Sequence, residues 1–287
     1  MQTLMAELIA SETFDSEILY LVLNSPELAG SAKPGQFVHI SCTESDSPLR
    51  HDPLLRRPIS IASVDRRAGQ IGLLIRVAGR GTRILQRVRD SEFLNLIGPL
   101  GSPFPFPENG AQALLVGGGI GVAPLFFLAQ DLRAEGIGIT TILGARTGRG
   151  LLFKERFAGF GALLTATEDG SYGTQGYVTS RLDEALKRSR TRLSNGHSAD
   201  GVQEATGIYE TAGGQGPVVY TCGPKAMMAE VVEFCRQEGL QVWVSLEEHM
   251  ACGVGACLVC ACKVQGHYRR VCFDGPVFDG REVDWDA

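Results

Sequence analysis

Residues 113–121 have the sequence Ala113-Leu114-Leu115-Val116-Gly117-Gly118-Gly119-Ile120-Gly121. The apolar start predicts a buried strand, and the glycines after it predict a tight turn. The apolar stretch Val122–Ala134 then predicts a helix, with Pro124 in the first turn, where a missing N–H costs little. Glycines allow a pyrophosphate to approach closely, and a helix N-terminus favours its charge. This unit predicts a nucleotide-binding α/β domain, and the alternative is a tight turn with no ligand.

The glycine turn departs from the complete dinucleotide-binding fingerprint. That fingerprint has an acidic residue about twenty positions further on, but Gly144-Ala145-Arg146-Thr147 occupies this region. Further strands and helices alternate along residues 106–240, which favours a parallel sheet. They are expected at Ile139–Leu143, Ala162–Thr167, Leu182–Lys187, Val218–Thr221 and Lys225–Glu238.

Two further features belong to this predicted domain. The polar stretch 189–216 predicts a mobile loop or insertion, with a functional lid as the alternative. Cys222-Gly223-Pro224 directly follows the last strand. Without further context, a single cysteine there is equally a small buried residue.

Residues 1–105 predict a small antiparallel β-barrel. Short apolar runs recur between turn residues, at Ile18–Leu23, Gln36–Ile40, Ile71–Val77 and Phe93–Ile97. A short helix is expected at Gly81–Val88.

Arg57-Pro58-Ile59-Ser60 lies in this β-rich part. The proline holds the chain extended, so that the arginine and the serine are available to a diphosphate. Leu74-Ile75-Arg76 and Gly81-Thr82 follow, and Gly81-Thr82 opens the predicted helix, whose backbone amides favour phosphate. Arg57-Pro58-Ile59-Ser60 alone is a weak signal, because a strand with a surface arginine explains it, but the combination is specific.

Residues 241–287 are rich in glycine and cysteine and are too few to bury a core unaided. Cys252, Cys257 and Cys260 have the x4 and x2 spacing of plant-type [2Fe–2S] ligands, and Cys272 supplies the fourth thiolate. Gly253 and Gly255 let the backbone approach a cluster and direct N–H groups at its sulfurs.

A structural zinc site is the alternative, although zinc usually takes two short cysteine knuckles. Cys262 is a fifth candidate ligand, because a strand over Leu258–Val264 would place it on the same side as Cys260. Cys260 is preferred because it completes the spacing.

Composition limits the remaining possibilities. The chain has 287 residues, a net charge of −5, 44% hydrophobic and 21% charged residues. This balance indicates a multidomain globular protein and argues against nucleic acid or a membrane as partners. The N-terminus does not resemble a secretory signal, so we expect a cytoplasmic protein in which the 8 cysteines serve metal or redox chemistry.

The order of these motifs resembles the ferredoxin–NADP reductase superfamily. Nearly end to end, with the segments 248–257 and 271–278, the chain is similar to the electron-transfer subunits of NAD-linked (class 1B) dihydroorotate dehydrogenases. The stretch 189–216 departs from that family, in which the connection is shorter.

The resemblance implies FAD on the barrel, held by Arg57–Ser60, Leu74–Arg76 and Gly81-Thr82. It implies NAD as co-substrate at Gly117–Gly121 and Cys222–Pro224, beside the [2Fe–2S] cluster. It also implies an FMN-containing catalytic subunit that oxidises dihydroorotate, in a heterotetramer with two of each subunit. The chain itself has no candidate nucleophile or base for dihydroorotate. Alternatives are a related NAD(P)H–ferredoxin or sulfide-type oxidoreductase subunit and a zinc-stabilised binding module.

Overall fold

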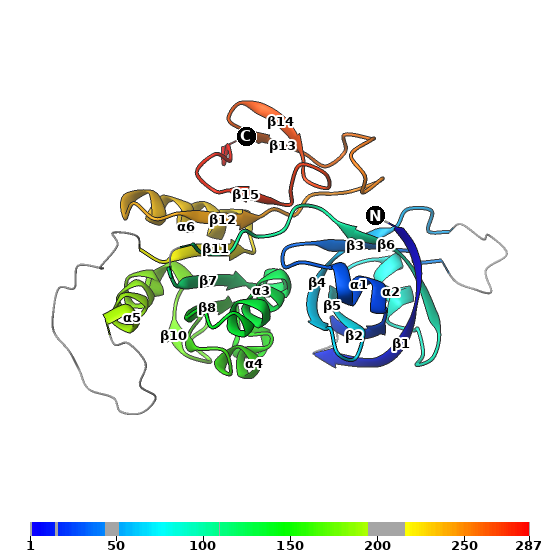
Figure 1. The fold of residues 1–287 in the computed structure, drawn as a ribbon, viewed down its shortest axis with the longest axis horizontal. Helices are drawn as coiled ribbons and strands as arrows, with labels where there is room; N and C mark the ends of the chain where they lie inside the picture. Colours follow the sequence, from blue (N-terminus) through cyan, green and yellow to red (C-terminus); the bar gives the residue numbers. More distant parts are fainter. Residues whose placement is uncertain (1, 15–16, 44–51, 109, 195–215, 287) are drawn as a thin grey trace.

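The computed structural model describes residues 2–14, 17–43, 52–108, 110–194 and 216–286. Within them the chain forms a closed six-stranded barrel, a seven-stranded sheet and a two-stranded hairpin. Figure 1 shows the barrel (blue to cyan) beside the larger sheet and its helices (green to yellow), with the C-terminal segment (orange to red) above both. The predicted combination of barrel, α/β sheet and C-terminal segment is confirmed.

The barrel consists of antiparallel strands in the order β1-β2-β5-β4-β3-β6. Alternate apolar side chains fill its interior, among them the fully buried Leu21, Val38 and Leu73. The elements are β1 (Gln2–Phe14), β2 (Ile18–Asn24), α1 (Pro26–Ser31), β3 (Phe37–Ile40), β4 (Arg57–Asp65), β5 (Gln70–Arg76), α2 (Arg80–Leu85) and β6 (Phe93–Leu100).

The larger sheet has the order β10-β9-β8-β7-β11-β12-β15, and neighbouring strands are parallel except for β12 and β15. The chain leaves β7 to one side and returns as β11 on the other, so the order reverses between them, which is where such sheets bind ligands. Its strands are β7 (Ala113–Gly118), β8 (Ile139–Ala145), β9 (Ala162–Thr167), β10 (Thr174–Gln175), β11 (Val218–Cys222), β12 (Val242–Ser245) and β15 (Val277–Asp279).

Four α-helices of the described chain accompany this sheet: α3 (Val122–Ala134), α4 (Lys154–Ala158), α5 (Leu182–Ser194) and α6 (Lys225–Gln237). Helix α3 has the predicted bounds, whereas α5 extends beyond the predicted end at Lys187. The stretch predicted as a loop at 189–216 therefore begins inside a helix, and its residues 195–215 lie outside the described residues. None of the helices in the described part of the chain has the length and apolarity needed to cross a bilayer.

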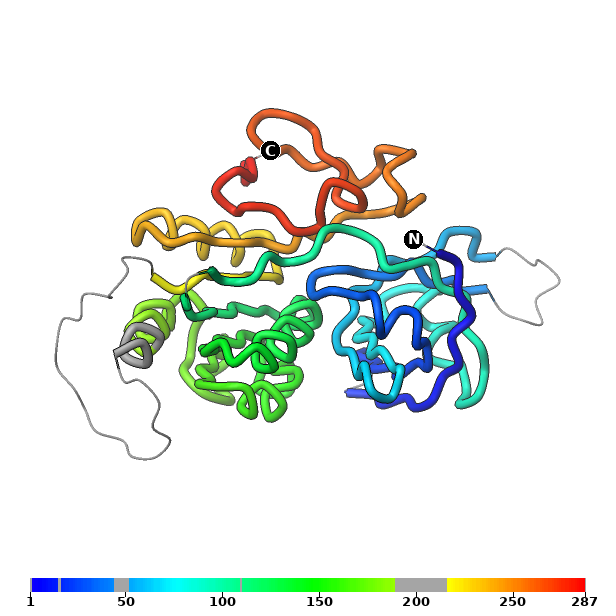
Figure 2. Tube along the Cα trace, in the orientation of Figure 1, coloured from blue at the N-terminus to red at the C-terminus, as the bar shows by residue number. Residues whose placement is uncertain are grey.

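The C-terminal segment connects the sheet with the barrel. After β12 the chain passes over the barrel, forms the hairpin of β13 (Ala261–Val264) and β14 (His267–Arg270), and returns to the sheet as β15, a path that Figure 2 shows as a continuous tube. The backbone N–H of Ser102 donates to the carbonyl of Gly275 at 2.6 Å, which joins the segment to the barrel side. Because β12 and β15 extend the larger sheet, the segment 241–287 shares a core with it. The division at residues 105 and 240 stays a prediction.

Candidate functional site

Arg57 and Gly81, two residues of the predicted diphosphate site, lie in contact. Arg57 begins β4, and its guanidinium lies over Gly81 in α2, so that a Cβ on Gly81 would be 3.0 Å from Nε. The Arg57 Nη1 donates to the carbonyl of Leu55 at 2.6 Å, which holds the side chain in place. A fixed guanidinium beside a helix start can bind a diphosphate.

The other predicted barrel residues divide into half-buried and buried groups. Pro58, Ile59 and Ser60 are half-buried on β4. Leu74 and Ile75 are buried, so only their backbone is available to a cofactor. The hydroxyl of Thr82 accepts from the N–H groups of Ala78 and Gly79 at 3.0 and 3.1 Å and thereby caps α2. These positions shape the surface around Arg57 rather than add charge to it.

Arg76 links the barrel with the nucleotide turn. It ends β5, and its guanidinium lies so near Gly119 that a Cβ there would be 3.3 Å from Nη2. Gly119 has a φ of +56°, in the region that favours glycine. The predicted flavin and nicotinamide residues are therefore neighbours across the junction of barrel and sheet.

The glycine turn packs directly on the backbone that follows β11. A Cβ on Gly121 would lie 2.5 Å from the carbonyl of Cys222 and 2.6 Å from the nitrogen of Gly223. Gly118 and Gly223 are also in contact, and Pro224 lies beside Gly118. The structure thus brings the two predicted nucleotide motifs together at the point where the strand order reverses.

Cys222 is buried at this junction, and its side chain hydrogen-bonds to that of Ser245. Burial raises the pKa of the Cys222 thiol well above its usual value, and the charge of Glu247 adds to the rise. Cys222 is therefore a neutral thiol. Protein around Glu247 raises the pKa of that carboxyl, and Arg76 opposes the rise.

Glu247 was absent from the predicted site. Its signal in the sequence is its position just after β12, next to β11 at the same edge of the sheet.

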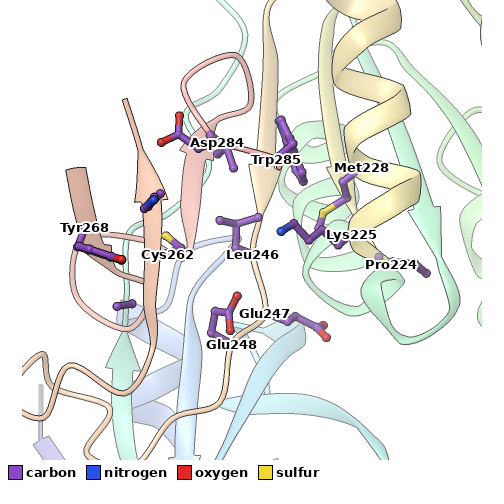
Figure 3. A pocket seen from close by; sticks show the side chains of 14 residues that line it. Pro224, Lys225, Met228, Leu246, Glu247, Glu248, Cys262, Tyr268, Asp284 and Trp285 are labelled. Atoms are coloured by element: carbon purple, nitrogen blue, oxygen red, sulfur yellow. The ribbon is translucent and has the colours of Figure 1, made fainter. Parts of the chain in front are cut away.

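A pocket of about 410 Å³ lies beside this junction, between α6 and the hairpin. Figure 3 shows Pro224 and Lys225 on one side, Tyr268 and Cys262 on the other, and Glu247 below. Solvent reaches the side chain of Glu247 here although protein surrounds most of it. The pocket gives the nicotinamide region an opening to solvent.

The four predicted cluster cysteines lie in two pairs of neighbours. Cys257 lies beside Cys252, and Cys260 lies beside Cys272. Among the described residues, no three His, Cys, Asp or Glu side chains gather around one point as a single metal ion requires. A [2Fe–2S] cluster takes two protein ligands on each iron, so a two-and-two arrangement fits it better than zinc.

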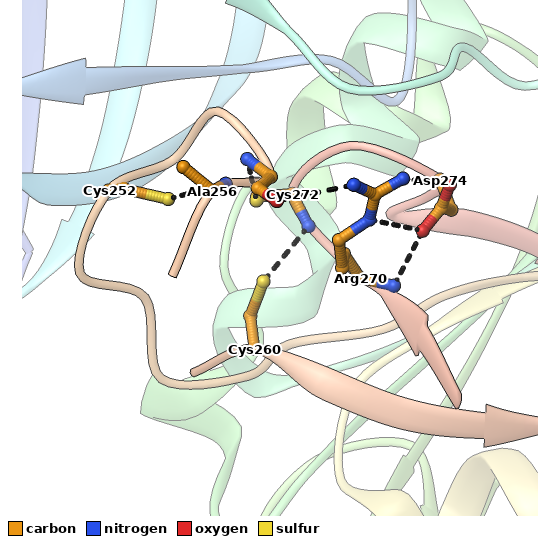
Figure 4. Close-up of polar contacts among 7 residues, drawn as sticks. Cys252, Ala256, Cys260, Arg270, Cys272 and Asp274 are labelled. Atoms are coloured by element: carbon orange, nitrogen blue, oxygen red, sulfur yellow. Dashed lines mark hydrogen bonds and ion pairs between the residues drawn. The ribbon is translucent and has the colours of Figure 1, made fainter. Parts of the chain in front are cut away.

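Backbone amides point at these sulfurs, as Figure 4 shows. Gly255 donates to Cys272 Sγ at 3.2 Å, Ala256 to Cys252 Sγ at 3.3 Å, and the amide of Cys272 to Cys260 Sγ at 3.4 Å. Such bonds stabilise thiolates and the sulfurs of a cluster. The thiol chemistry and the amides therefore fit a [2Fe–2S] cluster.

The two pairs differ in their protonation. Burial acts to raise the pKa of Cys252, but the amides of Val254 and Ala256 and the thiol of Cys257 lower it to about 6. Burial and the bond to Cys260 raise the pKa of Cys272 to about 12. Cys262 belongs to neither pair and lines the pocket. Its predicted strand begins only at Ala261, because Leu258 has a φ of +62°.

His39, which belongs to none of the predicted motifs, lies against the cysteine loop. It is 1% exposed on β3, and a Cβ on Gly253 would be 2.7 Å from its ring. Burial, with Arg56 and Arg57, lowers its pKa to about 4, so the ring is neutral near pH 7. Only the folded chain reveals this contact, because His39 and Gly253 come from opposite ends of the sequence.

Known proteins resemble this chain both in part and over its whole length. The family described as the iron-sulfur cluster binding domain of dihydroorotate dehydrogenase B matches residues 247–284. The dihydroorotate dehydrogenase B (NAD(+)) electron transfer subunit of Geobacillus thermodenitrificans is 39% identical over 281 residues, 96% of this chain and 94% of that protein. The same subunit of Desulforamulus reducens is 37% identical, over 96% of this chain and all of its own length.

Solved structures share the fold. The structure of an NADH-dependent reduced ferredoxin-NADP oxidoreductase is 29% identical with a TM-score of 0.77, over 98% of this chain and 90% of that one. A ferredoxin reductase of carbazole 1,9a-dioxygenase has a TM-score of 0.61 at 20% identity, over 83% of this chain and 66% of its own. At that identity the likeness concerns the fold alone.

Proposed function

We propose, because this chain belongs to the family of dihydroorotate dehydrogenase B (NAD(+)) electron transfer subunits, that it passes electrons from a catalytic subunit to NAD+ in pyrimidine biosynthesis. The route runs through a [2Fe–2S] cluster and FAD. The observation that carries this proposal is the two-and-two pairing of Cys252, Cys257, Cys260 and Cys272. It supports a binuclear cluster and not a zinc module.

Each part of the chain has a separate task. Arg57, with Gly81, holds the diphosphate of FAD, while Arg76 stands between the flavin and the nucleotide turn. The turn at Gly117–Gly121, packed on Cys222-Gly223, binds NAD. When bound, FAD supplies the conversion between one-electron transfer at the cluster and hydride transfer at the nicotinamide. The neutral thiol of Cys222 leaves the nicotinamide site without an added thiolate charge.

The catalytic subunit docks on the cysteine loop and the hairpin. Large apolar side chains are exposed around the cysteines, including Leu258 (64%), Val259 (54%), Tyr268 (74%) and Phe273 (61%). Leu258 and Tyr268 also line a hollow of about 480 Å³. Exposed apolar patches of this kind mark interaction surfaces. A partner there would stand next to the cluster, where one-electron transfer begins.

The partner carries FMN, and the complex contains two copies of each subunit. Dihydroorotate gives up two electrons while the cluster accepts one at a time, so the catalytic subunit needs a group that handles both, as a flavin does. We place the complex in the cytoplasm, because all eight cysteines are free and a reducing compartment keeps them so.

A second candidate is a subunit that exchanges electrons with ferredoxin. The likeness to the NADH-dependent ferredoxin-NADP oxidoreductase favours it, since that structure covers nearly the whole chain. The partner distinguishes the two candidates, because both have the same cofactors.

Anaerobic co-purification tests the proposal. We expect iron, sulfide and FAD on this chain, an FMN protein bound to it, and NAD+ reduction that depends on dihydroorotate. A complex that reduces ferredoxin but ignores dihydroorotate would establish the second candidate. A colourless zinc protein would refute both.

Substitutions test the docking surface. Leu258→Asp and Tyr268→Asp should each weaken binding of the catalytic subunit while the visible spectrum of the cluster persists. Phe93→Asp is the matched control, because Phe93 is 60% exposed on the barrel. Equal loss of binding in the control would contradict this location.

A further inference from the structure

His39 lies between the flavin motif and the cysteine loop. On one side, β3 pairs with β4 so that His39 is opposite Pro58 in the flavin motif. On the other side, its ring lies against Gly253, the residue after Cys252. Val38 and Ile40 belong to the barrel core, whereas His39 and Phe37 occupy the alternate positions of the strand, on the side of the C-terminal segment. Phe37 shares a hydrophobic cluster with Cys260 and Cys272.

Both nitrogens of this buried ring lack a hydrogen-bond partner among the described residues. A neutral imidazole has one N–H donor and one acceptor nitrogen, and a buried polar group normally has a partner. The ring is fixed by the edge of Phe37, at 6.1 Å between ring centroids, and by Gly253. An ordinary core histidine would bond to a nearby carbonyl or hydroxyl. His39 instead faces the part of the chain where the cluster binds.

We propose that His39 is a positioning residue for the iron–sulfur cluster, whose imidazole N–H donates to a sulfur of the bound cluster or of Cys252. The inference rests on the cluster ligands proposed above. It assigns to the barrel a direct contact with the cluster, in addition to the backbone amides of the cysteine loop. Gly253 is needed at this contact, because a Cβ would lie where the ring is.

A hydrogen bond to a cluster sulfur favours the reduced cluster, whose sulfurs carry more negative charge. His39 would therefore raise the reduction potential of the cluster and hold it at a fixed place beside the flavin strand. Loss of the bond should shift the potential to a more negative value without loss of FAD.

Pulsed EPR of the reduced, unmodified protein tests the contact. The chain has five histidines, so growth with ¹⁵N-histidine labels few nitrogens. We expect a ¹⁵N coupling to the cluster, together with an exchangeable proton that D₂O removes. A cluster signal with no histidine coupling would overturn the inference.

Variants identify the histidine responsible. In His39→Gln the ¹⁵N coupling should vanish, while the amide N–H of the glutamine keeps the reduction potential of the cluster near its original value. In His39→Leu the ¹⁵N coupling should vanish and the reduction potential should become more negative. His249→Gln and His267→Leu are controls at exposed histidines of the C-terminal segment. If the coupling persists in His39→Gln and is lost in His249→Gln, His39 is not the donor.

The outcomes also separate this inference from the proposed function. Unchanged cluster spectra and potentials in both His39 variants, with FAD and dihydroorotate-dependent activity intact, overturn this inference alone. Absence of any cluster from the unmodified anaerobic protein overturns the proposed function and this inference with it.

Discussion

Two glycine-rich turns belong to the proposed binding sites of this chain, and they are built in opposite ways. The nucleotide turn at Gly117–Gly121 joins a buried strand to a long helix, and its backbone packs on that of Cys222-Gly223. The cysteine loop at 252–260 has no regular secondary structure, and its contacts are amides that point at sulfurs. The fold forms the first turn whether or not a ligand is present. Because ligand thiolates couple metal binding to folding, we expect the second turn to be stabilised by a cluster.

A side chain added at Gly121 in the nucleotide turn should therefore have the largest effect on stability and on NADH binding. In Gly121→Val, the Cβ would meet the Cys222 carbonyl at 2.5 Å, and rigid backbone cannot yield as a side chain does. We expect a loss of about 1–3 kcal/mol in the free energy of unfolding, and failure to bind NADH. Thermal unfolding and NADH titration measure this. Gly30→Ala, with open space around it, should be harmless; a stable Gly121→Val protein would contradict the packing.

A substitution in the cysteine loop should affect the cluster and not the binding of FAD. In Cys257→Ser, one of the two sulfur pairs is lost, so we expect iron and the EPR signal to disappear while FAD stays bound. The cores of the barrel and of the sheet are formed mainly by residues outside the loop, so we expect the unfolding temperature to change little. Iron analysis, flavin fluorescence and far-UV circular dichroism measure the three outcomes. Cys262→Ser is the matched control, and loss of the cluster there would make Cys262 a ligand.

The same difference explains what could be predicted from the sequence. The helix Val122–Ala134 and the spacing of Cys252, Cys257 and Cys260 are local patterns, visible within a few turns of chain. Strand β1 was missed, because its exposed positions weaken the apolar pattern and its partners β2 and β6 define it. Strands β12 and β15 were missed as members of the larger sheet for the same reason: pairing between distant segments leaves no local signal.

The contacts between the parts of the site could not be predicted from the sequence either. Arg76 beside Gly119 and His39 beside Gly253 join residues from different domains. Arg76 belongs to a motif that the sequence predicts, but its position at the nucleotide turn depends on how barrel and sheet pack. The approach of His39 depends on the path of the C-terminal segment over the barrel.

Arg57→Ala tests a third kind of site, in which a side chain and not a turn holds the cofactor. The guanidinium over Gly81 is the charged group offered to the FAD diphosphate, and a hydrogen bond to a charged group contributes about 1.5–3 kcal/mol. We expect FAD affinity to fall roughly 10- to 100-fold, with the cluster unaffected. Fluorescence titration of the flavin-free protein measures this. Arg67→Ala, an exposed arginine of the barrel, should not change the affinity.

The smallest effect should come from the ion pair that supports the cysteine loop. Arg270 bonds to Asp274 through Nε and Nη2 at 2.9 and 3.0 Å, and its Nη1 donates to the carbonyl of Gly255 at 3.2 Å. The bond to Arg270 lowers the pKa of Asp274 below its ordinary value of 3.8. The stabilisation is therefore complete above pH 3.8 and is lost as the pH falls through the lowered pKa.

Asp274→Asn should thus speed cluster loss about two- to fivefold near pH 7, a small factor because the pair is partly exposed. It should also remove the acid step in cluster loss that we expect for the unmodified protein below about pH 4. Bleaching of the visible spectrum against pH measures both. Asp279→Asn is the matched control. Asp279 lies on β15, outside the cysteine loop, and forms a similar ion pair with Arg281. If both variants lose the cluster at the same rate, the support comes from the segment as a whole and not from the bond to Gly255.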